Sequence, residues 1–199
     1  MAYSRLGADW QANGDGIRSR RAARVILLDA DRRADQGPRV LLVRGHEADQ
    51  PSRSWWFAVG GGMDAGETPR QAAIREACEE TGILLDDADL VGPVLTRLAI
   101  FDFYAETVRQ DEEFFAARVS PRAVTTAGWT DVERELLDEL AWLTPAQLRA
   151  QPLEYFPENL PDAVETLHSQ LCGGGWDGIT WHLGDQDDDA GIRGQRAED

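Results

Sequence analysis

The chain has 199 residues, 42% of them hydrophobic, and a formal net charge of −16 at pH 7. This length and apolar content suit one domain with its own core, whereas the negative charge argues against a nucleic-acid backbone or an anionic membrane as the main partner. Two cysteines provide no disulfide framework, and no apolar run approaches the ~20 residues of a membrane span. No signal peptide opens the chain, so we expect a cytoplasmic protein with no nucleic-acid or membrane partner.

The first part of the chain predicts an arm followed by a hairpin. Residues 1–17 are mixed in character and dotted with glycine, which predicts an N-terminal arm. The apolar runs Val25–Leu28 and Val40–Val43 are typical of buried strands, and the polar stretch 29–37 between them indicates a turn. Arg44 follows the second run directly. It is either a candidate to bind a substrate phosphate or an ordinary surface arginine.

An aromatic run precedes a glycine-rich segment. Residues 51–54 are expected to form a loop, and Trp55–Phe57 begins the strand that leads to the glycines at 60–62. Trp56, within this run, is a candidate to stack against a nucleotide base. The alternative for these aromatic side chains is packing in the core.

The next segment carries strong helix signals at both ends. Thr68 and Gln71 form a capping box, and Pro69 suits the first helical position. Gly82 stands where a left-handed C-cap is needed. These signals predict a helix over residues 69–81.

This helix carries its carboxylates where they cost stability. Glu76, Glu79 and Glu80 share one face. Glu76 and Glu80 are like charges four residues apart, which costs roughly 0.2–0.5 kcal/mol, and Glu79 and Glu80 meet the negative end of the helix dipole. A solvated charged face is the ordinary explanation. The adjoining glycine loop favours a divalent-cation site instead, and an all-oxygen ligand set suits Mg²⁺, with Mn²⁺ as the alternative.

The spacing of these residues closely resembles the Nudix box. The matching residues are Gly61, Glu67, Arg75, Glu76, Glu79, Glu80, Gly82 and Ile83. The resemblance implies that Glu76, Glu79 and Glu80 bind metal with help from the Gly61 carbonyl, and that Glu67 pairs with Arg75 to hold the loop to the helix. One departure is visible upstream. The family often has proline before the glycine pair, and Val59 stands at that position here.

The rest of the chain predicts an α+β fold in which a mixed β-sheet is sandwiched between helices. Arg97 lies in an apolar stretch, residues 91–104, and is a further candidate for substrate binding. The remaining expected elements are a turn at 106–109, strands at 113–119 and 141–143, and helices that begin near residues 130, 145 and 161. We expect a Nudix hydrolase domain at 18–171 and a flexible, glycine-rich and acidic tail at 172–199.

The resemblance implies a metal-dependent hydrolase that cleaves a pyrophosphate bond. The substrate would be a small nucleotide, a nucleoside diphosphate linked to another group, attacked by water at phosphorus. A modified nucleoside triphosphate, a nucleotide sugar and a dinucleoside polyphosphate all remain open, and a homodimer is compatible with this function. Deprotonating the water needs a carboxylate. Glu76 is the first candidate, and the downstream alternatives are Glu112, Glu113, Glu133 and Glu135.

Two other functions use the same fold. A Nudix-like sensing domain binds its ligand without turnover, but such domains usually lose box carboxylates and this chain keeps all four. An isomerase of the isopentenyl diphosphate type needs a cysteine outside the box helix. Cys172, beside a glycine run, is the only such cysteine in the sequence.

Overall fold

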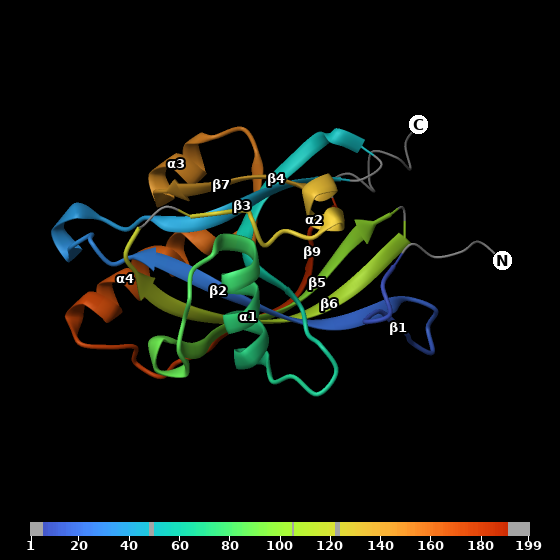
Figure 1. The fold of residues 1–199 in the computed structure, drawn as a ribbon, viewed down its shortest axis with the longest axis horizontal. Helices are drawn as coiled ribbons and strands as arrows, with labels where there is room; N and C mark the ends of the chain where they lie inside the picture. Colours follow the sequence, from blue (N-terminus) through green and yellow to red (C-terminus); the bar gives the residue numbers. More distant parts are fainter. Residues whose placement is uncertain (1–5, 48–49, 105, 122–123, 191–199) are drawn as a thin grey trace.

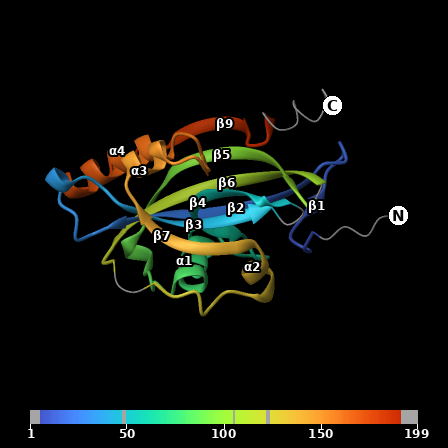
Figure 2. The same cartoon turned by 90° about the horizontal axis from the view of Figure 1, so that it is seen from above.

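The computed structural model describes residues 6–47, 50–104, 106–121 and 124–190. Within these ranges the chain forms one nine-stranded mixed sheet with helices on both faces (Figures 1 and 2). The strands are β1 (Gln11–Ala12), β2 (Arg18–Asp29), β3 (Val40–Glu47), β4 (Gln50–Gly62), β5 (Val91–Phe103), β6 (Glu106–Val119), β7 (Leu137–Leu143), β8 (Glu154–Phe156) and β9 (Trp181–Asp187). The α-helices are α1 (Pro69–Thr81), α2 (Asp131–Leu136), α3 (Pro145–Ala150) and α4 (Leu160–Gly173), with short 3₁₀ helices at Ala34–Gln36 and Asp87–Asp89. The expected sheet between helices is confirmed.

The sheet order is β7-β3-β4-β2-β6-β5-β9, with β1 paired to β2 and β8 paired to β4. Strand β2 is central: it runs antiparallel to β4 and parallel to β6. Its side chains alternate between two cores. Val25 and Leu27 pack on the α1 face, whereas Ile26 and Leu28 pack on the face covered by α3 and α4. The continuous apolar run thus reflects a strand that is buried on both sides.

Helix α1 has the predicted boundaries. The Thr68 hydroxyl accepts a hydrogen bond from the main-chain N–H of Gln71, whose side chain completes the capping box. Gly82 closes the helix in the left-handed conformation, at φ 72°. Local signals were sufficient here because both caps depend on residues adjacent in sequence.

Two expected loops are strands instead. Residues 51–54 lie within β4, and the expected turn at 106–109 is the first part of β6. The turn between β5 and β6 comes earlier, where Tyr104 has a positive φ of 50°. Within the described ranges, none of the helices combines the length and apolar character needed to cross a lipid bilayer.

Both ends of the described chain are more ordered than expected. In the N-terminal arm, β1 pairs with β2, and Trp10 is buried against Phe101 and Phe103. At the other end, β9 adds to the sheet in parallel with β5. A flexible tail from residue 172 is therefore wrong for this segment, while residues 191–199 lie outside the described ranges. Trp181 also packs against the core on the α3 and α4 face.

Candidate active site

The glycine loop at the end of β4 packs directly against its neighbours. Gly60 has a φ of 137°, and a Cβ there would lie 2.3 Å from the main-chain oxygen of Ala23. A Cβ on Gly61 would lie 2.8 Å from Oε1 of Glu76. A side chain at position 60 would push β4 away from β2, so glycine is needed there, whereas a Cβ at position 61 would displace the Glu76 carboxylate. The loop and the Glu76 carboxylate are thereby held in contact.

Arg75 joins the loop to the helix. Its Nε donates to Oε1 of Glu67 at 3.0 Å, and its Nη2 donates to Oε2 of Glu67 at 2.9 Å. Nη2 also donates to the Gly62 main-chain oxygen at 2.9 Å. The ion pair lowers the pKa of Glu67, outweighing the opposing effect of burial. The expected pair of Glu67 and Arg75 is present.

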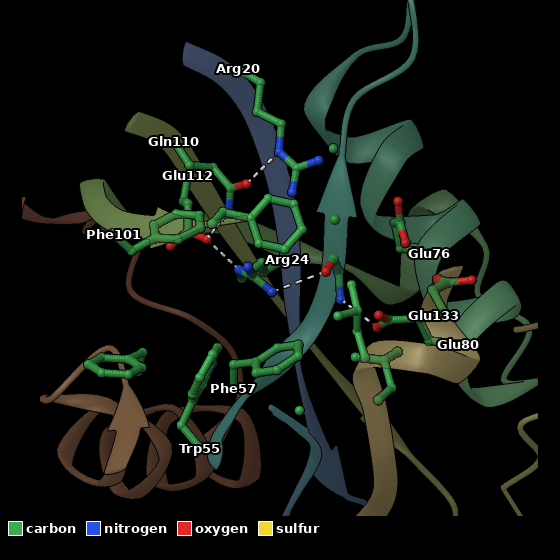
Figure 3. Close-up of a pocket in the computed structure, with 18 of the residues that line it drawn as sticks. Arg20, Arg24, Trp55, Phe57, Glu76, Glu80, Phe101, Gln110, Glu112 and Glu133 are labelled. Carbon is green, nitrogen blue, oxygen red and sulfur yellow. Dashed lines mark hydrogen bonds and ion pairs between the residues drawn. The ribbon is translucent and has the colours of Figure 1, made fainter. Parts of the chain in front are cut away.

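Three carboxylates converge beside this loop (Figure 3). Glu76, Glu80 and Glu133 each place an oxygen within 4.8 Å of the other two. Glu76 and Glu80 are buried, and Oε2 of Glu80 accepts a hydrogen bond from the Gly60 N–H at 2.8 Å. Burial raises the pKa of Glu76 and raises that of Glu80 well above its ordinary value, and nearby like charges add to both effects. A set of oxygen donors that repel one another fits a hard divalent cation.

The third member of this cluster differs from the predicted one. Glu79 is about half exposed, and its Oε2 accepts a hydrogen bond from Nη1 of Arg75 at 2.9 Å. It lines the same cavity as the cluster. Glu133 from α2 joins Glu76 and Glu80 in this cluster.

The loop before α2 docks on the C-terminal end of α1. Nε1 of Trp129 donates to the main-chain oxygen of Glu80 at 2.9 Å, and the Thr125 N–H donates to that of Thr81 at 3.0 Å. Nε of Arg134 donates to the Trp129 main-chain oxygen at 3.0 Å. Carbonyls that a helix end leaves without partners are thus satisfied. The same contacts fix the position of Glu133.

A buried ion network forms another wall of the site. Glu112 is fully buried, and its carboxylate accepts hydrogen bonds from Arg24, Arg97 and Gln110. Burial acts to raise its pKa, but the two guanidinium groups lower it to about 2. Nη1 of Arg24 also donates to the main-chain oxygens of Ala58 and Gly60. Arg24 therefore supports the glycine loop from behind.

The predicted substrate contacts have different outcomes. Arg97 lines the cavity, where Glu112 and Asp188 hold its guanidinium. Trp56 is buried on the opposite face of the sheet, and its Nε1 donates to Oε1 of Gln151 at 2.6 Å. Arg44 is paired with Asp138 and Glu139 of β7. Among the described residues, neither Arg44 nor Trp56 lines the cavity, which corrects both predictions.

The geometry also separates the proposed general bases. The carboxylate oxygens of Glu112 are occupied by arginine, and Glu113 is paired with Arg21. Glu135 is exposed on α2. Among the described candidates, Glu76, Glu112 and Glu133 line the cavity, whereas Glu113 and Glu135 do not.

One cavity of about 670 Å³ connects these groups. The carboxylate cluster lies on one side of it, and Trp55, Phe57 and Phe101 lie on the other (Figure 3). Sequence reasoning missed Trp55 as a lining residue. Strand alternation places Trp55 and Phe57 on the face opposite Trp56, but three consecutive aromatic residues do not indicate which face is the core.

Comparison with known proteins agrees with this geometry. A family model described as the NUDIX domain matches residues 18–164. The uncharacterized Nudix hydrolase YvcI of Bacillus subtilis (strain 168) is 49% identical over 43 residues, which is 22% of this chain and 27% of that protein. An RNA pyrophosphohydrolase of Erythrobacter litoralis (strain HTCC2594) is 34% identical over 84 residues, 42% of this chain and 46% of that protein. The chain thus spans less than half the length of either relative.

Solved structures share the fold. The NUDIX domain of Shewanella oneidensis NrtR, complexed with ADP ribose, matches with a TM-score of 0.52 and 18% identity over 73% of this chain and 86% of that one. The MutT protein of Bacillus halodurans matches with a TM-score of 0.50 and 20% identity, over 85% and 91% of the two chains. At these identities the likeness concerns the arrangement of sheet and helices.

Proposed function

This chain belongs to the NUDIX domain family, and from that premise we propose that it hydrolyses a pyrophosphate bond with the help of a divalent metal ion. The substrate is a nucleoside diphosphate linked to another group, and water attacks at phosphorus. The observation that carries this proposal is the meeting of Glu76, Glu80 and Glu133 at the wall of a cavity large enough for a nucleotide.

The cluster supplies the ligands for the ion. We assign Glu76, Glu80 and Glu133 to it, with the Gly61 carbonyl as a further oxygen donor, and Mg²⁺ as the ion with Mn²⁺ as the alternative. Bound there, the ion offsets the charge that develops on phosphate oxygens. A metal-binding role for Glu79 stays a prediction. Its carboxylate meets Arg75, which places it at the edge of the cluster.

The chain itself must hold and deprotonate the attacking water. A catalytic base works best when another group fixes its orientation. Nη1 of Arg75 donates to Oε1 of Glu76 at 2.8 Å, and Arg75 is in turn fixed by Glu67. We therefore assign the proton acceptor to Glu76. Glu112 is a poor base because its pKa lies at about 2, although burial alone would raise that pKa.

A panel of nucleotides with Mg²⁺ tests the proposal. It contains modified nucleoside triphosphates, nucleotide sugars, dinucleoside polyphosphates and a 5′-triphosphorylated RNA oligonucleotide, and the released monophosphate or pyrophosphate is measured. The RNA is included because a relative is an RNA pyrophosphohydrolase. The net charge of −16 leads us to expect turnover of small nucleotides over the RNA.

Two variants make the panel decisive. Glu80→Gln should lower the rate about a hundredfold, equivalent to about 2.7 kcal/mol of transition-state stabilisation. Glu135→Gln is the matched control, since this exposed side chain does not line the cavity. Tight nucleotide binding without any turnover would reject hydrolysis and support a sensing domain.

A further inference from the structure

The half of the cavity away from the carboxylate cluster is lined by aromatic rings. Trp55 and Phe57 come from β4, Phe101 and Phe103 from β5, and Phe156 from β8. Trp55, Phe57 and Phe101 lie across the cavity from Glu76, Glu80 and Glu133 (Figure 3). Trp55 and Phe101 remain partly accessible to solvent. Aromatic faces that line an open cavity provide stacking surfaces for a flat ring.

The arginines of this half are already neutralised. Each of the four guanidinium groups that line it is paired with a carboxylate: Arg20 with Asp9, Arg24 with Glu112, Arg53 with Asp189 and Glu47, and Arg97 with Glu112 and Asp188. Among the described residues, none of the arginines that line this half is therefore left without a carboxylate partner. A second anionic group in this half would have to compete with these carboxylates for the arginines.

The same carboxylates decide which edge a ligand presents. An ionised carboxylate accepts hydrogen bonds and donates none. Asp188 brings such oxygens from the segment after β9, and Asp9 brings them from the N-terminal segment. A ring that carries amino donors is favoured here, and a ring that presents only carbonyl oxygens at that edge is repelled.

We infer that this aromatic and acidic half of the cavity binds an uncharged nucleobase that carries an exocyclic amino group. The base stacks on Trp55, and the phosphates extend toward the carboxylate cluster. This inference deepens the proposed function, on which it rests for the placement of the phosphates. The new element is the identity of the group that occupies this half of the cavity. That group is the base, and not a second phosphate-bearing group.

Binding without turnover tests the inference directly. The full chain is titrated in EDTA with adenosine, purine riboside and ribose 5-phosphate, and binding is followed by calorimetry and by quenching of tryptophan fluorescence. Purine riboside differs from adenosine only in having hydrogen in place of the exocyclic amino group. Adenosine should bind about ten- to a hundredfold tighter than purine riboside. Ribose 5-phosphate, which has a sugar and charge but no base, should not compete with it.

Variants of Trp55 locate the site. Trp55→Ala should weaken adenosine binding at least about fivefold, and Trp55→Phe should restore most of it because it keeps a flat ring. Trp176→Phe is the control, since Trp176 packs on the opposite face of the sheet. Equal binding of adenosine and purine riboside, competition by ribose 5-phosphate, or an unchanged affinity in Trp55→Ala would each overturn the inference.

The two proposals fail in different ways. If adenosine binds as expected but no nucleotide in the Mg²⁺ panel is hydrolysed, the base site stands and the proposed hydrolysis fails. If nucleotides are hydrolysed but adenosine does not bind at Trp55, the hydrolysis stands and the base site is rejected.

Discussion

Replacing Glu133 with Gln should stabilise the metal-free protein and reduce the stabilisation that Mg²⁺ adds. Glu133 places a carboxylate oxygen within 4.8 Å of oxygens of both Glu76 and Glu80. At that distance two like charges repel by about 3 kcal/mol at an effective dielectric constant of about 20, and by about 1 kcal/mol in water. Glu133 is partly exposed, so the lower figure applies. The raised pKa of Glu80 favours its neutral form, so repulsion from Glu76 alone gives about 1 kcal/mol.

Gln is the right replacement because it keeps the structural role of the side chain. Oε2 of Glu133 accepts a hydrogen bond from the Thr130 N–H at 2.6 Å and completes the capping box of α2. Glutamine serves equally well at this position of a capping box. The substitution thus removes the charge from the cluster and leaves the helix start intact.

Thermal unfolding with and without Mg²⁺ measures both effects. In EDTA at about pH 8, Glu133→Gln should unfold about 2–4 °C above wild type. Mg²⁺ at 100 times its wild-type dissociation constant stabilises wild type by about 2.7 kcal/mol, whereas tenfold weaker binding limits the variant to about 1.4 kcal/mol. Glu135→Gln, on the same helix but exposed, should change neither quantity. A Glu133→Gln protein with a wild-type Mg²⁺ shift and no gain in EDTA would refute the assignment of Glu133 to the metal site.

Three further predictions concern the surroundings of the cluster. Because its pKa is raised, Glu80 holds a proton in the folded, metal-free protein that it releases in the unfolded chain. The stability in EDTA should therefore fall as the pH rises above about 4.5. Acidification also relieves the overall negative charge, so the diagnostic result is that the stability of Glu80→Gln depends less on pH than that of wild type. Glu112→Gln leaves Arg24 and Arg97 without their shared anion and should lower the free energy of unfolding, measured by chemical denaturation, by about 3–5 kcal/mol. Glu113→Gln is the control, and because its ion pair is partly exposed it should lower that free energy by about 1 kcal/mol or less. Trp129→Phe removes the hydrogen bond to the Glu80 carbonyl, so it should lower the free energy of unfolding by about 1–3 kcal/mol and weaken Mg²⁺ binding. An unchanged Mg²⁺ affinity would show that this loop does not help to position the metal site.

The sequence was most informative where signals are local. The caps of α1 predicted its boundaries, the apolar run of β2 predicted a strand buried on both faces, and the capping box at Thr144 predicted the start of α3. Each of these signals acts between residues a few positions apart. Such preferences hold whenever the surrounding fold agrees with them.

Polar and aromatic runs were less informative. Strand β9 has a mixed acidic sequence with alternating exposure, so its composition resembles that of a tail. Its order comes from pairing with β5, nearly 90 residues earlier. The candidates Arg44 and Trp56 were misplaced because the sequence around them does not indicate which face of the sheet is exposed to the cavity.

The sequence by itself determined the helix that carries Glu76 and Glu80, the glycine loop beside it and the pairing of Glu67 with Arg75 that the family resemblance implied. Only the tertiary structure decided that Glu133, more than 50 residues beyond Glu80, completes the cluster, and that Trp55 and Asp188 line the same cavity. The physical reason is range. Capping and periodicity act within a few turns of the chain, whereas a ligand set and a cavity depend on where packing brings distant segments together.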